Sequence, residues 1–387
     1  MTIRSEQRLT VLQVLPALDS GGVERGTLEV AEELVRRGHR STVVSAGGRM
    51  VNRLMASGSE HFSMPIGAKS PFTLRHVPAF RRLLLHVRPD ILHVRSRMPA
   101  WIAWLAWRSL PAEHRPRFLT TAHGMYSVNR YSAIMTRGEK VIAVSNTIRD
   151  YLLQNYPALP EDRIHVIHRG VAPETFPYGF QPTSSWKSKF LADHPRAAGK
   201  PIITLPGRIT RLKGHPEFLD LMNSLKNAGV DAHGLIVGGA APGKERYLRE
   251  LEADVASRGL SEHVTFTGHR RDIQEIFSIS QMVLSLSRKP ESFGRTVLEA
   301  INLGVPVIGH DMGGVGEVLA QLFPSGRVPP GDAEALCQQV RQFLEHPPEV
   351  PQNTRFTLQE MLDKTLDIYD ALTGRGGETT TPINTAA

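Results

Sequence analysis

The chain has 387 residues, of which 41% are hydrophobic and 22% are charged. This length exceeds one ordinary core and suits two domains of roughly 150 to 200 residues each, with the composition of a soluble globular protein. No apolar run is long enough to cross a membrane, and the polar first nine residues lack the core of a signal peptide. The single cysteine, Cys337, excludes a disulfide framework and a cysteine-based metal cluster, so we expect a cytoplasmic protein.

The formal net charge of +8 favours anionic partners such as nucleotides or phospholipid head groups. The arginines of the first third are spread along the chain, so an ordinary solvated surface and a membrane-facing patch fit equally well. A peripheral position on the cytoplasmic face of the inner membrane therefore stays open. Nucleic acid is not expected, because no basic module interleaved with aromatic residues occurs.

The first half alternates short apolar runs, typical of buried parallel strands, with helical spacing. A helix is expected over 23–37, where Gly38 ends it, and another over 147–155, where Ser145 is a good N-cap. Strands are expected over residues 9–15, 41–45, 91–94, 118–122, 140–144 and 164–167.

The second half repeats this alternation after a polar stretch, about residues 173–200. Strands are expected over 202–205, 232–237, 264–267, 282–286 and 305–309, and helices over 216–227, 244–258, 273–278, 296–303 and 359–372. The two βαβ series predict an α/β protein of two doubly wound Rossmann-like domains that face a central cleft. We expect these domains over 1–172 and 173–345, a helical segment over 346–373 that packs back toward the first domain, and a disordered tail over 374–387.

Two loops in the second half carry residues suited to an anionic ligand. The first follows a strand and holds Gly207, Arg208 and Lys213 before a helix that starts near Pro216, a pattern typical of a diphosphate site. The second is ESFGRTVLE, Glu291 to Glu299. Its two carboxylates lie a little over two helical turns apart, so they suit two ends of one elongated ligand. From residue types alone, a basic surface loop and an amphipathic helix with two surface glutamates remain alternatives.

The ordered set of motifs resembles the retaining glycosyltransferase family 4, of the GT-B fold. The resemblance covers most of the chain. It is carried by Gly21-Gly22-Val23-Glu24-Arg25, Thr121-Ala122-His123-Gly124, Val144-Ser145, His168-Arg169-Gly170-Val171, Gly207-Arg208 with Lys213-Gly214, the Glu291–Gly304 stretch, and Gly313-Gly314 with Glu317. His168-Arg169 departs from a more usual asparagine, and Arg295 with Thr296 stand where apolar residues are frequent, which bears on donor choice.

The resemblance implies a donor site, with Arg208 and Lys213 at the diphosphate. Glu291 would bind hydroxyls of the donor sugar, and Glu299 would bind the ribose. Phe293 and Gly294 would give backbone contacts, with Arg295 and Thr296 also at the substrate. Gly21 and Gly22 would let a loop of the first domain approach the phosphate or acceptor. His123 would lie over the sugar, although a packing histidine is the alternative. The catalytic set is thus His123, Glu291, Arg208 and Lys213, with Glu291 not assigned as a nucleophile.

The implied reaction moves a hexose-type sugar, with a UDP-sugar favoured, and retains anomeric configuration. Preplaced cations stabilise the leaving diphosphate, and no Asp-x-Asp stands in a suitable loop, so we expect neither a metal nor another cofactor. The expected acceptor is a hydroxyl of a cell-envelope glycan or glycolipid, such as lipopolysaccharide core. Its candidate contacts are Arg95, Arg97, Tyr126 and Arg130.

Three tryptophans, Trp101, Trp104 and Trp107, belong either to an amphipathic core helix or to a lipid contact. At the level of function, a non-catalytic nucleotide-sugar-binding protein and a sugar epimerase of GT-B fold are the alternatives.

Overall fold

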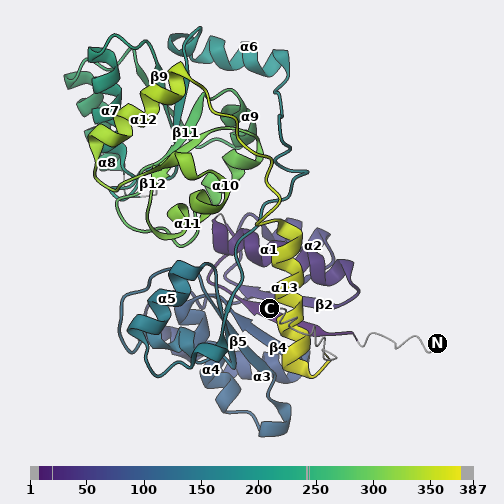
Figure 1. Ribbon diagram of the computed structural model, residues 1–387. Helices are drawn as coiled ribbons and strands as arrows, with labels where there is room; N and C mark the ends of the chain where they lie inside the picture. The colour runs from purple at the N-terminus through teal and green to yellow at the C-terminus, as the bar shows by residue number, and fades with distance from the viewer. Residues whose placement is uncertain (1–7, 20, 241–242, 244, 376–387) are drawn as a thin grey trace, which may run out of the picture. The chain divides into compact units, whose positions relative to one another are not determined.

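The computed structural model describes residues 8–19, 21–240, 243 and 245–375 (Figure 1). It divides into two compact units: unit 1 comprises the chain up to His168 and from Gln359 onward, and unit 2 comprises Arg169–Leu358. The sequence placed these boundaries after residues 172 and 345, so residues 346–358 lie in unit 2 rather than with the C-terminal helix. The tail expected to be disordered lies outside the described residues from 376 onward.

Unit 1 is built on a parallel sheet of seven strands in the order β3-β2-β1-β4-β5-β6-β7. Each strand predicted from an apolar run is present. The edge strand β3 was not predicted, because its sequence EHFS carries no apolar run and its side chains are largely accessible. The strands are β1 (Thr10–Val14), β2 (Arg40–Ser45), β3 (Glu60–Ser63), β4 (Ile91–Val94), β5 (Arg117–Ala122), β6 (Lys140–Ala143) and β7 (Ile164–Val166).

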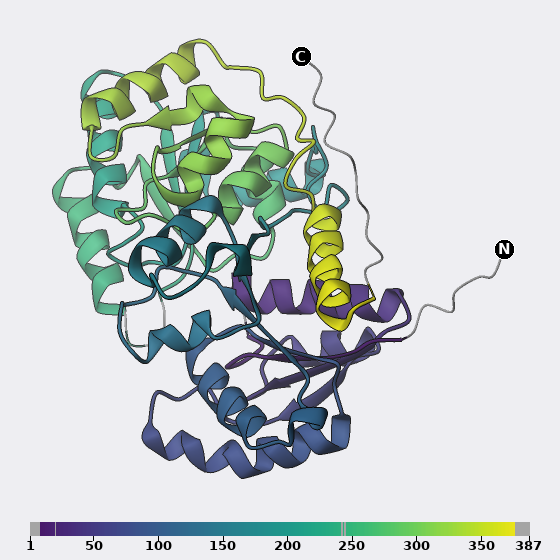
Figure 2. The same ribbon diagram turned by 60° about the horizontal axis from the view of Figure 1, so that its bottom comes forward.

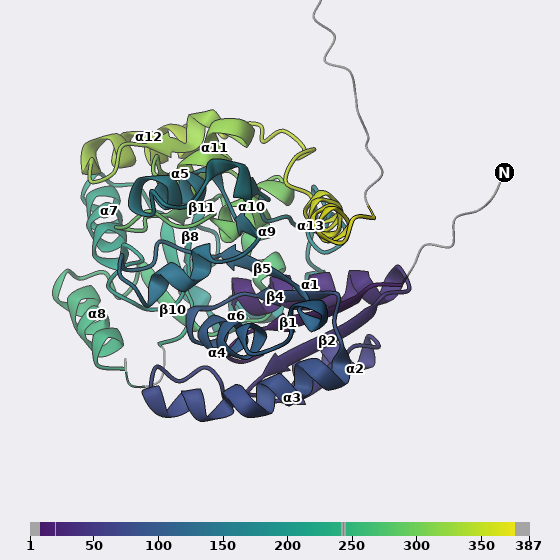
Figure 3. The same cartoon turned by 90° about the horizontal axis from the view of Figure 1, so that it is seen from below.

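The helices of unit 1, apart from the C-terminal one, connect these parallel strands. Ser145 caps α5 as predicted, since its hydroxyl accepts a hydrogen bond from the Ile148 amide. Figure 3 shows α3 and α4 side by side. The α-helices are α1 (Gly22–Arg36), α2 (Val51–Ala56), α3 (Val77–Val87), α4 (Arg97–Arg108), α5 (Asn146–Asn155) and α13 (Leu358–Thr373), with 3-10 turns η1 (Pro71–His76), η2 (Ala112–His114), η3 (Ser132–Thr136) and η4 (Glu161–Arg163).

Unit 2 is built on a parallel sheet of six strands in the order β10-β9-β8-β11-β12-β13. Its strands are β8 (Ile202–Pro206), β9 (His233–Val237), β10 (Val264–Gly268), β11 (Met282–Ser285), β12 (Val307–His310) and β13 (Arg327–Val328). Its helices are α6 (Ser184–Asp193), α7 (His215–Asn227), α8 (Glu245–Ser257), α9 (Ile273–Ser278), α10 (Arg295–Asn302), α11 (Gly313–Leu322) and α12 (Ala333–Glu345), with η5 (Pro195–Ala197) and η6 (Pro324–Gly326).

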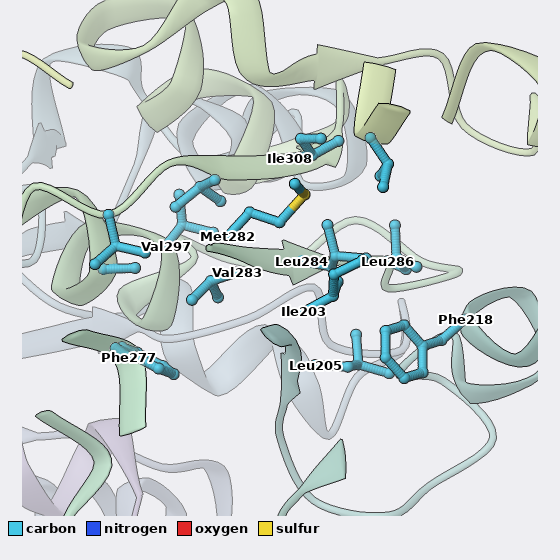
Figure 4. Close-up of a cluster of buried hydrophobic side chains, with 14 of the residues drawn as sticks. Ile203, Leu205, Phe218, Phe277, Met282, Val283, Leu284, Leu286, Val297 and Ile308 are labelled. Atoms are coloured by element: carbon cyan, nitrogen blue, oxygen red, sulfur yellow. The ribbon is translucent and has the colours of Figure 1, made fainter. Parts of the chain in front are cut away.

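The core of unit 2 holds its central strands in place. Leu205 of β8, Leu284 of β11 and Ile308 of β12 are buried in one cluster, together with Phe218 of α7 (Figure 4). Strands buried on both faces read as continuous apolar runs, which is why the sequence located them. The loops that follow β8 and β11 therefore start from fixed points.

Helix α13 joins unit 1 through a buried polar network as well as through packing against α1 (Figures 1 and 2). Tyr369 is fully buried, and its hydroxyl lies 2.7 Å from His93 Nδ1, while His93 Nε2 lies 2.6 Å from Thr121 Oγ1. Burial raises the pKa of Tyr369 to about 12, against the opposing effect of the nearby Arg95 charge. The C-terminal helix α13 thus shares a buried polar network with β4 and β5.

Among the described residues, no helix has the length and apolar character needed to cross a membrane.

Candidate functional site

The strand order of unit 2 reverses direction between β8 and β11. In an open parallel sheet, ligands bind outside the carboxyl ends of the strands at such a switch point. The two loops that leave this point are residues 207–214, after β8, and residues 286–294, after β11. They are the two segments in which the sequence placed the diphosphate and sugar contacts.

An ion pair connects these two loops. Lys213 Nζ lies 2.6 Å from Glu291 Oε1, and their side chains are 29% and 23% exposed. The Ser287 hydroxyl also donates to Glu291 Oε1. The half-buried carboxylate therefore lies between an ammonium and a hydroxyl, while enough surface remains for a ligand to reach both charges. The structure thus brings together Lys213 and Glu291, which are 78 residues apart in sequence.

Glycines make this close approach of the loops feasible. Gly214 has φ +75°, and a Cβ added there would lie 2.0 Å from the Leu286 carbonyl oxygen. A Cβ at Gly207, whose φ is +139°, would lie 3.3 Å from Lys213 Cδ. Only glycine adopts these conformations without cost, so the first loop can lie directly against the end of β11.

The loop that carries Glu291 is fixed from its other side by α11. Gly314 N–H donates to the Glu291 carbonyl over 2.8 Å, and a Cβ at Gly314 would lie 2.2 Å from Phe293 Cα. Gly294 (φ +90°) is the N-cap of α10 and brings no capping side chain. The motif Gly313-Gly314 therefore acts as a support for the Glu291 loop, a role that the sequence did not reveal.

The second carboxylate of this segment, Glu299, is only 4% exposed on α10. Arg295 Nε lies 3.6 Å from Glu299 Oε1, one helical turn earlier. The carboxylates of Glu291 and Glu299 thus have different cationic neighbours, Lys213 and Arg295.

The remaining predicted residues of unit 2 differ in accessibility. Arg208 is exposed on the loop after β8, and Thr296 is half-buried in the first turn of α10. Phe293 is 3% exposed, and its ring packs edge-on against Phe356 with centroids 5.7 Å apart. The side chain of Phe293 therefore belongs to the core of unit 2.

The pKa values of two histidines of unit 2 shift in opposite directions. Burial lowers the pKa of His215, on α7 beside the site, to about 4, despite a hydrogen bond with the Thr210 carbonyl. At His310, burial is outweighed by Glu217, so the pKa is raised. His310 Nε2 lies 2.8 Å from Glu217 Oε1, and Nδ1 lies 3.1 Å from the Ser287 carbonyl. Since both ring nitrogens face acceptors, protonated His310 ties the loop after β11 to α7.

In unit 1, Gly21 and Gly22 are exposed at the start of α1. Gly21 has φ +141°, and a Cβ at Gly22 would meet nothing within 4 Å. His123 follows β5 and is half-buried, with its amide donating to the Tyr126 hydroxyl over 3.2 Å. These residues lie at carboxyl ends of parallel strands, where the sequence placed them.

The predicted acceptor residues Arg97 and Tyr126 contact each other. The Arg97 guanidinium lies 4.7 Å from the centre of the Tyr126 ring and 5.4 Å from that of Tyr131. Trp101 Nε1 donates to the Tyr131 carbonyl over 2.9 Å. The start of α4 and the segment after His123 therefore form one cluster, and Arg130 is exposed beside it.

The prediction that Arg95 contacts an acceptor disagrees with its burial. Arg95 is 2% exposed, and its Nε and Nη2 atoms donate to Gln13 Oε1 over 2.9 and 2.6 Å. Burial lowers the pKa of Arg95. Its position after a strand suggested a loop, but the side chain turns into the core toward Tyr369, which is why its role is structural.

Among the described residues, no group of three or more histidine, cysteine, aspartate or glutamate side chains is arranged to hold a metal ion.

Comparisons with known proteins agree with the geometry of both units. Residues 20–175 match the family described as Glycosyltransferase Family 4, and residues 187–358 match Glycosyl transferases group 1. A glycosyltransferase from Rickettsia africae is 32% identical, with a TM-score of 0.85, over 96% of this chain and 100% of that one. Anabaena HepE, solved with UDP-glucose, is 18% identical, with a TM-score of 0.79 over 94% and 100% of the two chains, and shows the fold alone.

Two curated relatives are mannosyltransferases by name. Phosphatidyl-myo-inositol mannosyltransferase of Mycobacterium leprae is 25% identical over 338 residues, 84% of each chain. Lipopolysaccharide core biosynthesis mannosyltransferase LpsB of Rhizobium meliloti is 30% identical over 187 residues, 48% of this chain and 49% of that protein. The chain spans less than half the length of several other curated relatives that it matches. The protein has the GT-B fold and belongs to glycosyltransferase family 4.

Proposed function

We propose that this glycosyltransferase moves a hexose-type sugar from a nucleoside-diphosphate sugar, preferentially a UDP-sugar, to a hydroxyl of a cell-envelope glycan or glycolipid such as lipopolysaccharide core. The observation that carries the proposal is the ion pair of Lys213 and Glu291 at the switch point of unit 2. An ammonium beside a carboxylate suits a donor whose diphosphate is anionic and whose sugar offers hydroxyl donors.

In the proposed reaction, the bond between the anomeric carbon and the diphosphate oxygen breaks while the acceptor oxygen bonds to the same face of the sugar. The acceptor proton goes to the departing phosphate, so configuration is retained. Arg208, Lys213 and the amides at the start of α10 stabilise the negative charge that develops on the diphosphate. Glu291 holds sugar hydroxyls, Glu299 holds the ribose, and His123 of unit 1 covers the sugar.

The relatives support the donor and acceptor classes. HepE is a protein solved with UDP-glucose, and the two mannosyltransferases are named for a phospholipid and for lipopolysaccharide core. The net charge of +8 suits an anionic acceptor and a peripheral position on the cytoplasmic face of the inner membrane.

A donor panel tests this proposal. The full chain is incubated with UDP-, GDP- and ADP-sugars without acceptor, and release of each nucleoside diphosphate is followed with and without EDTA. We expect slow turnover of one donor class, at a rate that EDTA does not change. No turnover of any donor would contradict the proposed function, and loss of turnover in EDTA would contradict metal independence. Proton NMR of a product formed with an acceptor then reports whether the anomeric configuration is retained.

A further inference from the structure

Unit 1 contains a pocket of about 610 Å³ that the donor site does not account for. It lies between η1, α4 and the segment that follows His123, and its apolar walls include Leu74, Met98, Trp101 and Leu105. The last three residues are spaced by three and four positions on α4, so one face of the helix lines the pocket. Its volume is in the range of cavities that hold a small organic ligand.

Two cations also line this apolar pocket. Lys69 and Arg130 are among its walls, and neither forms an ion pair within residues 8–19, 21–240, 243 and 245–375. Phe72 and Leu74 on η1 are 70% and 41% exposed, although most large apolar side chains of unit 1 are buried. An apolar pocket with unpaired positive charges suits a molecule that has both an apolar chain and an anionic group.

The apolar pocket is connected to the predicted acceptor cluster. Tyr131 lines the pocket, and the Arg97 guanidinium lies 5.4 Å from the centre of its ring. Trp101 also lines the pocket and donates to the Tyr131 carbonyl. A ligand whose chain fills the pocket would therefore have its polar end beside the segment that carries His123 and Tyr126.

We infer that the apolar pocket binds the lipid chain of an anionic acceptor, with Lys69 and Arg130 at its charged group. This inference rests on the proposed function and deepens it, since it assigns a place to the apolar part of the acceptor. The protein's own segments 1–7 and 376–387, which lie outside the described residues, are polar in sequence. They are therefore not the expected occupants of the apolar pocket.

The test uses dodecyl phosphate, a single-chain anionic amphiphile, below its micelle concentration. Binding to the full chain is measured by calorimetry without any donor sugar. Inorganic phosphate is the probe of the anionic group alone, and the neutral dodecyl maltoside is the probe of the same chain with an uncharged head group. We expect dodecyl phosphate to bind at least about tenfold more tightly than either of them.

Substitutions locate the binding. Leu74→Glu places a carboxylate against the dodecyl chain, and it should weaken dodecyl phosphate binding by at least about tenfold. Arg130→Gln removes a positive charge and should also weaken this binding. The matched controls are Met55→Glu, another exposed apolar residue at 56% on α2, and Arg341→Gln on α12, and both should bind like the original chain. Thermal unfolding of each variant checks that it folds.

Three results would overturn the inference: no binding of dodecyl phosphate, equal loss in the control variants, or binding to anionic vesicles without binding of the monomer, which would indicate a membrane surface contact instead. The binding experiment contains no donor sugar, so its result does not depend on whether the protein transfers a sugar. Turnover in the donor panel with no amphiphile binding would contradict the pocket alone, and amphiphile binding with no donor turnover would contradict the proposed reaction.

Discussion

At the residue scale, the charged side chains near the switch point of unit 2 differ in their burial and in their contacts. Glu291 meets both an ammonium and a hydroxyl, whereas Arg208 on the neighbouring loop remains exposed. A diphosphate that enters between the loops would meet Lys213 already held at the switch point. Groups held before the reaction need little reorganisation when charge develops, which is the main source of electrostatic catalysis.

Buried histidines predict how the stability of unit 2 depends on pH. Burial holds the pKa of His215 and that of His233 at about 4, below the ordinary value of 6.5. The unfolded chain therefore binds more protons between pH 6.5 and 4, and stability that is present above pH 6.5 is lost as pH falls. For His215, which is 1% exposed, the loss is at most about 3 kcal/mol.

Urea unfolding at pH 7 and pH 5 checks this expectation. We expect His215→Gln to show a smaller drop in midpoint than the original chain, because glutamine does not titrate. His346→Gln, at an exposed position of the same unit, should keep the full drop. An equal drop in all three proteins would show that His215 is not the source. His310 acts in a separate window, since its raised pKa means that its contribution is lost only as pH rises through that value.

At the scale of elements, the site depends on how closely α7 approaches the end of β11. Gly214 and Gly229 have the same φ of +75°, but only Gly214 faces backbone, with the Leu286 carbonyl oxygen 2.0 Å from an added Cβ. Gly229→Ala should therefore cost only the left-handed backbone strain, about 1 kcal/mol. Gly214→Ala should cost roughly 3 kcal/mol or more, because the loop must move as well.

The same pair of variants separates stability from function. We expect Gly214→Ala to lose donor turnover even at a temperature where it is folded, because the shift separates Lys213 from Glu291. Gly229→Ala should keep turnover, as nothing lies within 4 Å of its added Cβ. Urea midpoints and nucleoside diphosphate release provide the two readouts. Similar losses in both variants would contradict the role given to the close contact at Leu286.

At the scale of the whole molecule, the sequence predicted the two parallel sheets well because their central strands are buried on both faces. The short edge strands β3 and β13 were not predicted, since EHFS and a two-residue RV segment have no periodicity of their own and depend on pairing with neighbours. The boundaries of the units also differ from the predicted ones, because they depend on contacts between segments far apart in the sequence. Gly170 packs against the Thr357 backbone, and the Val171 amide donates to the Phe356 carbonyl. These contacts hold the first and the last residues of unit 2 together.

The sequence proposed which residues form the donor site, but it did not predict their contacts. The order of motifs identified Lys213 and Glu291, yet their ion pair joins residues 78 apart, and the Ser287 hydroxyl had no signal in the sequence. Arg95 was misplaced because position after a strand does not tell whether a side chain faces solvent. Its burial depends on α13, whose Tyr369 is 276 residues away from His93 in the same network.

The most direct test of the donor site compares release of nucleoside diphosphate by Lys213→Ala and Glu291→Ala with that by the original chain. The control is Lys364→Ala, which breaks an ion pair of the same 2.6 Å length with Glu360 on the surface of α13. We expect Lys213→Ala to lower the rate about 100-fold or more, Glu291→Ala at least about tenfold, and Lys364→Ala less than about twofold. Undiminished turnover in both Lys213→Ala and Glu291→Ala would contradict the assignment of the donor site to the Lys213–Glu291 pair.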